Sequence, residues 1–168
     1  APVEQVRKKP ALTLFDHLAR RAVVSEGETV DGGPVYIHQA TIRVGGAFRT
    51  GQIQHDDQRI DALVSLLEEV VGDFAAPIST TTRLSTELDK TIKAQVNYLV
   101  QCRQLSLGMG NLIKFLRTCI AKLPIDATID TARGTLLGKL QNFSEERVAQ
   151  ARLTIAKKVQ GVIQDGDV

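Results

Sequence analysis

The sequence predicts an all-α bundle of about five helices with a long C-terminal helix. Apolar residues recur every three or four positions along most of the chain after residue 37, as they do on the buried face of a helix. No segment shows a convincing alternation of apolar and polar residues, which a half-buried strand would require. Pro77 and Pro124 stand between periodic stretches, where a residue that cannot continue a helix is expected. The 168 residues suffice for one sizeable core.

Residues 1–34 are expected to be an N-terminal extension, followed by a helical domain at 35–168. Glycines and Pro34 punctuate the extension, which favours turns and loop. Its one apolar cluster predicts a short helix or turn docked on another surface, and consists of Leu12, Leu14, Phe15 and Leu18.

The first two helices are expected at about residues 35–51 and from about residue 56 to residue 74. The second has the clearest apolar face, made of Ile60, Leu63, Val64, Leu67, Val70, Val71 and Phe74. Asp56 or Asp57 is placed to cap its start. The segment from Ala75 to Pro77 is expected to end it, because proline cannot donate to the helical hydrogen-bond ladder.

A third helix, with Ser79 or Thr80 placed as its cap, carries apolar residues at Leu84, Leu88, Ile92, Val96 and Leu99. A polar corner at residues 101–103 separates it from a fourth helix at about 105–122, which Ser106 could cap. Gly108 and Gly110 weaken the fourth helix by about 1 kcal/mol each relative to alanine, and their small size lets another backbone approach closely.

The last element is expected at about residues 126–164. It carries a broad apolar stripe, made of Leu136, Leu140, Phe143, Val148, Ala151, Ile155, Val159 and Val162. The segment 142–144 is a candidate bend.

Composition argues against several classes of protein. The net charge of +2 and the absence of tryptophan argue against a nucleic-acid-binding surface. No apolar run is long enough to span a membrane, and no apolar signal core follows the basic residues 7–9. Cys102 and Cys119 lack metal-ligand spacing and are expected to be free, buried thiols in a reducing cytosol. The predicted location is therefore cytoplasmic, without membrane or nucleic-acid partners.

The histidines and nearby acids suggest a metal site only weakly. His38 and His55 stand apart, His17 is isolated, and Asp56 and Asp57 follow His55 without a dedicated ligand spacing. Helix capping explains the two acids better, so we expect neither a metal nor a cofactor.

Four collinear stretches of the sequence resemble the regulatory subunits of eukaryotic translation initiation factor 2B, and the delta type most closely. The stretch 101–116 contains Gln-Cys-Arg, Leu-Ser and a terminal Lys-Phe-Leu, and it is similar to a characteristic segment of that family. Segments 12–18 and 37–51 resemble the family's leading segment and first helix. Residues 165–168 resemble the Asn-Gly-Asp-Val that opens its Rossmann-like domain. The departures are Gln39 and Gln104, where the family usually has proline, and residues 19–34, which do not match in detail.

This resemblance implies a fold, a function and partners. A Rossmann-like domain is expected after residue 168, so the chain is expected to be a fragment truncated before it. The domain would regulate the guanine nucleotide exchange factor for translation initiation factor 2, bind the other subunits of that factor, and dock the alpha subunit of initiation factor 2. It would sense phosphorylation of that alpha subunit and perform no chemistry, because another subunit carries out exchange.

The resemblance also places partner-binding positions. The acidic residue with which the last helix of the delta type contacts its partner falls on Glu146, and Arg147 follows it. Gln150 stands where the family has a leucine. A basic contact of the family falls on Thr86, with Arg83 one turn away as a substitute. From charge alone, a solvated helix face is the favoured interpretation of Glu146 and Arg147. The resemblance changes that, so Glu146 and Arg147 are expected to serve binding rather than folding. Leu12 and Leu14 match a pocket where two regulatory subunits meet, or else form a local contact with the bundle.

The polar corner at residues 101–103 also suggests an enzymatic alternative. The family resembles in fold the methylthioribose-phosphate and ribose-bisphosphate isomerases, in which a matching Arg-Pro-Thr-like corner helps to hold a sugar phosphate. Arg103, Ser106 and Asn111 could form such an anion site at a helix start. The favoured interpretation is that Arg103 ties the corner together by hydrogen bonds, because the proline is missing and the isomerases' catalytic groups lie in the Rossmann-like domain.

Overall fold

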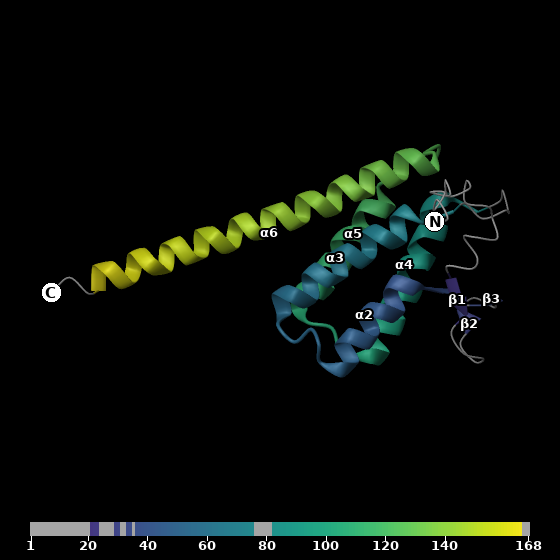
Figure 1. The fold of residues 1–168 in the computed structure, drawn as a ribbon. Coiled ribbons are helices and arrows are strands. Elements are labelled where there is room, and N and C mark those ends of the chain that lie inside the picture. Colours follow the sequence, from purple (N-terminus) through teal and green to yellow (C-terminus); the bar gives the residue numbers. More distant parts are fainter. Residues whose placement is uncertain (1–20, 24–28, 31–32, 35, 76–81, 166–168) are drawn as a thin grey trace, which may run out of the picture.

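The computed structural model describes residues 21–23, 29–30, 33–34, 36–75 and 82–165. Its helices are α2 (Gln39–Thr50), α3 (Asp56–Gly72), α4 (Leu84–Cys102), α5 (Leu107–Ala121) and α6 (Ile129–Asp165). Figure 1 shows α2 to α5 grouped as a bundle, with α6 packed along one side and projecting far past it. The predicted all-α bundle with a long C-terminal helix is confirmed.

Two short antiparallel ribbons precede the bundle. Strand β1 (Arg21–Val23) pairs with β4 (Tyr36–His38), and β2 (Thr29–Val30) pairs with β3 (Gly33–Pro34). The expected first helix therefore starts later than residue 35. Strands of two or three residues are too short to show an alternating pattern, so they could not be predicted from periodicity. The predicted apolar cluster at residues 12–18 lies outside the described residues.

Helix α2 has defined caps at both ends. The Nδ1 atom of His38 accepts a hydrogen bond from the backbone N–H of Ala40, at 3.0 Å, so histidine takes the capping role. The helix ends at Gly51, whose φ of 74° lies in the left-handed region that glycine adopts at little cost. The predicted C-terminal end near residue 51 is confirmed.

The starts of α3 and α4 differ from prediction. His55 is the N-cap of α3, while Asp56 and Asp57 lie in the first turn, where their charges favour the helix dipole. Arg83 is the N-cap of α4 and makes no side-chain capping bond. The caps predicted for these helices were therefore wrong. Ser79 and Thr80 themselves lie outside the described residues.

Helix α5 begins as predicted. The hydroxyl of Ser106 accepts a hydrogen bond from the backbone N–H of Met109, at 3.3 Å. A Cβ atom added to Gly108 would lie 2.5 Å from Cδ1 of Ile60, so glycine does permit a close approach there, to a side chain of α3. Gly110 has open space around it, and the same prediction was wrong for that residue.

The core surrounds α3, which packs against α2, α5 and α6 and more lightly against α4. Leu63, Leu67 and Val71 are fully buried along its inner face, which is the face that the apolar period predicted. Leu88, Ile92 and Leu99 of α4 and Met109, Leu112 and Leu116 of α5 complete the centre. Burial of this apolar surface is the main favourable contribution to folding.

One buried amide joins α4 to the start of α2. The Oε1 atom of Gln95 accepts hydrogen bonds from the backbone N–H of His38, at 2.9 Å, and from the hydroxyl of Thr41, at 2.7 Å. Its Nε2 atom donates to the carbonyl oxygens of Tyr36, at 3.1 Å, and Thr91, at 3.2 Å. Gln95 is 1% exposed, so water cannot replace these bonds.

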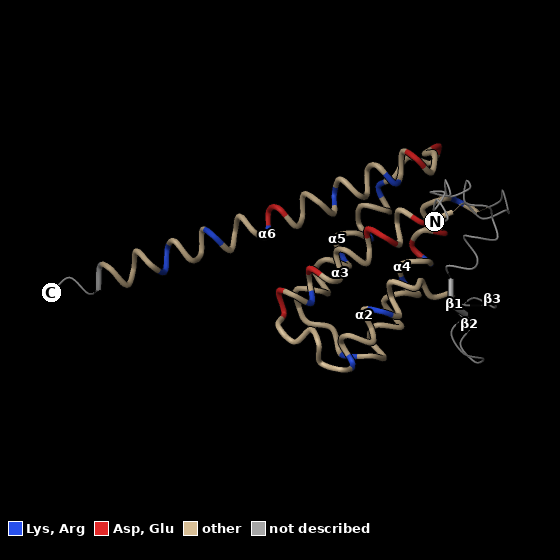
Figure 2. Tube along the Cα trace, viewed as in Figure 1, with Lys and Arg blue, Asp and Glu red and all other residues tan. Residues whose placement is uncertain are grey.

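Helix α6 has two different halves. It runs unbroken for 37 residues, so the predicted bend at 142–144 is absent. In its first half Ala132, Leu136 and Leu140 are buried. Its second half exposes large apolar side chains, at Leu153, Ile155, Val159, Val162 and Ile163. The charges between residues 147 and 164 are all basic, as the blue segments of the projecting half show in Figure 2. The predicted apolar stripe is thus buried only in its first half.

Candidate functional site

Arg147 fastens the middle of α6 to the start of α3. Its guanidinium lies 3.2 Å from Oδ1 of Asp57 and 2.8 Å from Oδ1 of Asp61, and it donates a further bond to the carbonyl oxygen of Asp57 at 3.4 Å. The Arg147 side chain is 24% exposed. The sequence predicted that Arg147 serves binding rather than folding. Its ion pairs to α3 give it a role in folding that this prediction did not include, and its role in partner binding stays a prediction.

Replacing Arg147 with glutamine should lower the free energy of unfolding by about 0.5–1 kcal/mol, because two exposed ion pairs are lost. Urea denaturation at low salt measures the change. The loss should shrink in 1 M NaCl, because the Debye length there is only about 3 Å and the attraction between the charges is weaker. Arg152→Gln is the matched control, since Arg152 is exposed and has no ion pair within the described residues. Equal losses in both variants would contradict the structural role of Arg147.

Glu146 and Gln150 lie one turn apart on α6 and are both exposed. Glu146 lines the edge of a groove between α5 and α6, and its carboxylate makes no ion pair within the described residues. The backbone carbonyl of Gln150 accepts a hydrogen bond from the hydroxyl of Thr154 at 2.9 Å, and the exposed Gln150 side chain makes no hydrogen bond within the described residues. These two side chains are available to a partner.

Arg83 and Thr86 lie at a different place on the bundle. Both are exposed at the start of α4, where the backbone N–H of Thr86 donates to the carbonyl of Arg83 at 3.0 Å. The start of α3 lies beside the end of α4. A hydrogen bond from Arg59 of α3 to the carbonyl oxygen of Gln104, just after α4, at 2.6 Å shows this arrangement. The two helices are thus antiparallel, and the start of α4 lies toward the end of α3, away from Arg147.

The distance between the two ends of α3, measured along α6, follows from the two arginines that fasten α6 to α3. Arg133 donates to the carbonyl oxygen of Phe74, just beyond the end of α3, whereas Arg147 binds the start of α3. Fourteen residues of helix between them span about 21 Å. The structure therefore does not bring Arg83 and Thr86 together with Glu146, and a partner that touched both would cover an extended surface.

The groove between α5 and α6 has a volume of about 470 Å³. Its lining residues come mainly from these two helices and are Phe115, Thr118, Cys119, Lys122, Leu123, Pro124, Thr135, Lys139, Asn142, Phe143 and Glu146. The rings of Phe115 and Phe143 face each other with centroids 5.2 Å apart. Of these lining residues, only Glu146 was predicted from the sequence to belong to a site. Phe115 and Cys119 are four residues apart, and this helical spacing, which places both on one face of α5, was the signal available in the sequence.

The corner between α4 and α5 is held by a residue other than the one predicted. Arg59 of α3 bonds the carbonyl of Gln104, and its guanidinium lies 5.2 Å from the centre of the Phe48 ring. The side chain of Arg103 is exposed and makes no hydrogen bond within the described part of the chain. The prediction that Arg103 ties the corner together was therefore wrong. Asn111 is exposed, and Leu12 and Leu14 lie outside the described residues.

Two further titratable groups, Tyr98 and Arg117, have pKa values that their surroundings shift. Burial raises the pKa of the Tyr98 hydroxyl, and nearby Cys102 raises it further. A hydrogen bond to Asp89 raises the pKa of Arg117, which joins α5 to α4 at 2.7 Å. Cys102 and Cys119 are free thiols but are half-buried rather than buried. No group of histidine, cysteine or acidic side chains within the described ranges could hold a metal ion.

No helix in the described part of the chain is both long enough and apolar enough to cross a membrane.

Comparison with known proteins gives consistent matches. Residues 61–168 match the Initiation factor 2 subunit family. The translation initiation factor eIF2B subunit delta of Schizosaccharomyces pombe is 34% identical over 165 residues, covering 98% of this chain and 34% of the relative. The protein of the same description from Dictyostelium discoideum is 30% identical over 166 residues, covering 94% of this chain and 26% of the relative. The chain thus spans about a third or less of these relatives.

Solved structures show the same fold. The crystal structure of eIF2B delta from Chaetomium thermophilum superposes with a TM-score of 0.67 and 26% identity, covering 73% of this chain and 45% of that one. The tetrameric eIF2B-beta2-delta2 complex from C. thermophilum gives a TM-score of 0.63 and 26% identity, covering 67% of this chain and 35% of the matched one. The resemblance to the delta type that the sequence motifs predicted is confirmed.

Proposed function

Because this chain belongs to the initiation factor 2 subunit family, we propose that it is the helical regulatory domain, residues 35–168, of a delta-type subunit in the exchange factor for translation initiation factor 2. The observation that carries this proposal is the similarity to delta subunits along 98% of the chain. A related delta chain occurs in a complex with beta subunits, so we extend the proposal to binding other subunits of the same factor. We assign the chain no catalytic residue, since exchange belongs to another subunit in the resemblance described above.

The proposed partner of this domain is the alpha subunit of initiation factor 2, docked on the exposed face of α6. Glu146 offers an unpaired carboxylate to a basic segment, and Gln150 lies beside it on the same face. The anchors at Arg133 and Arg147 hold this part of α6 rigidly on α3, which suits a binding surface. Arg83 is the exposed cation that could meet a phosphate, with Thr86 next to it.

Phosphorylation sensing follows if the phosphorylated partner binds one state of the complex more tightly. Such differential binding would shift the whole complex toward its inactive state, because a ligand moves an equilibrium only by its difference in affinity for the two states. The pocket assigned to Leu12 and Leu14 stays a prediction. The isomerase alternative gains no support from the relatives and structures described above, which are delta-subunit proteins or a complex containing them.

Exchanging Glu146 for lysine in the assembled exchange factor should weaken binding of the phosphorylated alpha subunit about tenfold, because the new charge repels a basic segment of the partner. Nucleotide exchange should then be inhibited less by phosphorylated substrate, while exchange on unmodified substrate is retained. Glu145→Lys is the matched control, because Glu145 is an exposed neighbour that does not line the groove. Undiminished inhibition in the Glu146 variant would show that this helix face is merely solvated.

A further inference from the structure

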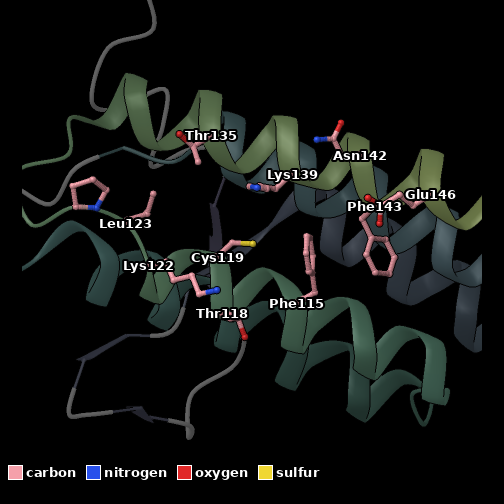
Figure 3. Close-up of a pocket in the computed structure, with 11 residues that line it drawn as sticks. Phe115, Thr118, Cys119, Lys122, Leu123, Thr135, Lys139, Asn142, Phe143 and Glu146 are labelled. Carbon is pink, nitrogen blue, oxygen red and sulfur yellow. The ribbon is translucent and has the colours of Figure 1, made fainter.

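The groove between α5 and α6 combines an aromatic wall with a positively charged end. Phe115 and Phe143 are both half-buried, so part of each ring faces the groove. Figure 3 shows Glu146 beside Phe143, with Lys122 and Lys139 nearer the other end. Lys122 is the C-cap residue that follows α5, Lys139 lies on α6, and both line the same cavity.

The two lysines of the groove form no ion pair with the described part of the domain. Neither lysine ammonium group has an ion-pair or hydrogen-bond partner among the described residues, and the same holds for the amide of Asn142. Lys139 and Glu146 are seven residues apart on one helix, which corresponds to about 10 Å along its axis. A positive end and a negative edge are therefore separated by the aromatic pair.

We propose that this groove binds a small organic anion with a ring-sized apolar body. The anionic group, a carboxylate or phosphate, would lie between Lys122 and Lys139, and the apolar body would lie against Phe115 and Phe143. A volume of about 470 Å³ is in the range of small-molecule pockets, which combine apolar walls with a few polar groups. Glu146 disfavours a second negative group at the far end, so the ligand carries its charge at one end only.

Cys119 provides a built-in reporter of occupancy. Its thiol lines the groove and is half-buried, and the sequence contains only one other cysteine, Cys102. In the Cys102→Ser form of the 168-residue chain, the rate of modification by the neutral reagent dithiodipyridine reports on this one thiol. A molecule seated in the groove would block the reagent and slow the reaction.

Phenylbutyrate is the probe, and phenylbutyramide is its neutral counterpart of nearly the same shape. Phenylbutyrate should slow the modification of Cys119 saturably, and its apparent affinity should exceed that of the amide about threefold to tenfold, as expected for two screened charges. Replacing Lys122 and Lys139 with glutamine should remove this difference. Lys114→Gln is the control, because Lys114 is an exposed lysine of α5 that does not line the groove.

Two results would overturn the proposal. One is the absence of saturable protection by phenylbutyrate. The other is equal protection by the acid and the amide in the chain with both lysines intact. Circular dichroism spectra of each variant show whether the helices are intact, so a misfolded variant is not mistaken for one that has lost binding. Neither result bears on Glu146 in the exchange assay, so failure here and failure of the proposed regulatory function are distinguishable.

Discussion

Replacing Leu67 with alanine is expected to lower the free energy of unfolding by about 2–5 kcal/mol, through lost apolar burial and the cavity that remains. Leu67 is 0% exposed in the middle of α3, the helix around which the others pack. A loss of this size is a large part of the stability of a typical domain, which is about 5–15 kcal/mol. Urea denaturation followed by circular dichroism measures it.

Ser65→Ala is the control for this prediction, because Ser65 is exposed on the same helix. Its effect should stay within about 0.5 kcal/mol. Similar losses from the two substitutions would mean that the buried face of α3 is misassigned.

Replacing Gln95 with leucine should cost about 2–5 kcal/mol, although leucine is no smaller than glutamine and leaves little cavity. The backbone N–H of His38 and the carbonyl of Tyr36 would each lose a buried partner, and every such loss costs about 1–3 kcal/mol. Thr41 would lose the acceptor of its hydroxyl as well. Thermal and urea denaturation measure the change.

Asn97→Leu provides the comparison for Gln95, because Asn97 is exposed on the same helix and its side chain makes no hydrogen bond within the described residues. If Gln95→Leu and Asn97→Leu lowered the free energy of unfolding equally, the hydrogen bonds of Gln95 would not be a major source of stability.

The parts of the fold that depend on local period and capping could be predicted from sequence. The buried face of α3 follows from helical spacing alone, and the start of α5 follows from Ser106. The start of α2 could not be predicted, because His38 is an uncommon cap and β4 has only three residues. The apolar stripe of α6 predicted a face but could not show where packing ends, since periodicity carries no information about the partner of that face.

The candidate site divides in the same way. Glu146 and Gln150 share a face because four residues make about one helical turn. The partners of Arg147 could not be predicted, because Asp57 and Asp61 precede it by 90 and 86 residues and meet it only in the folded bundle. The same holds for the groove, whose two walls come from separate helices.

The geometry of α6 makes its projecting half a lever whose fulcrum is Arg147. Beyond that residue, 18 more helical residues reach Asp165, about 27 Å away. A rotation of α6 by only about 5° on the bundle would therefore move its far end by about 2.4 Å, for a rigid helix of that length. The ion pairs to Asp57 and Asp61 resist such a rotation at the point where it begins. Because Arg133 and the buried Leu136 and Leu140 also hold the first half of α6, the bundle sets the direction of the projecting half, and a small change in that packing would move the far end more than the anchored part.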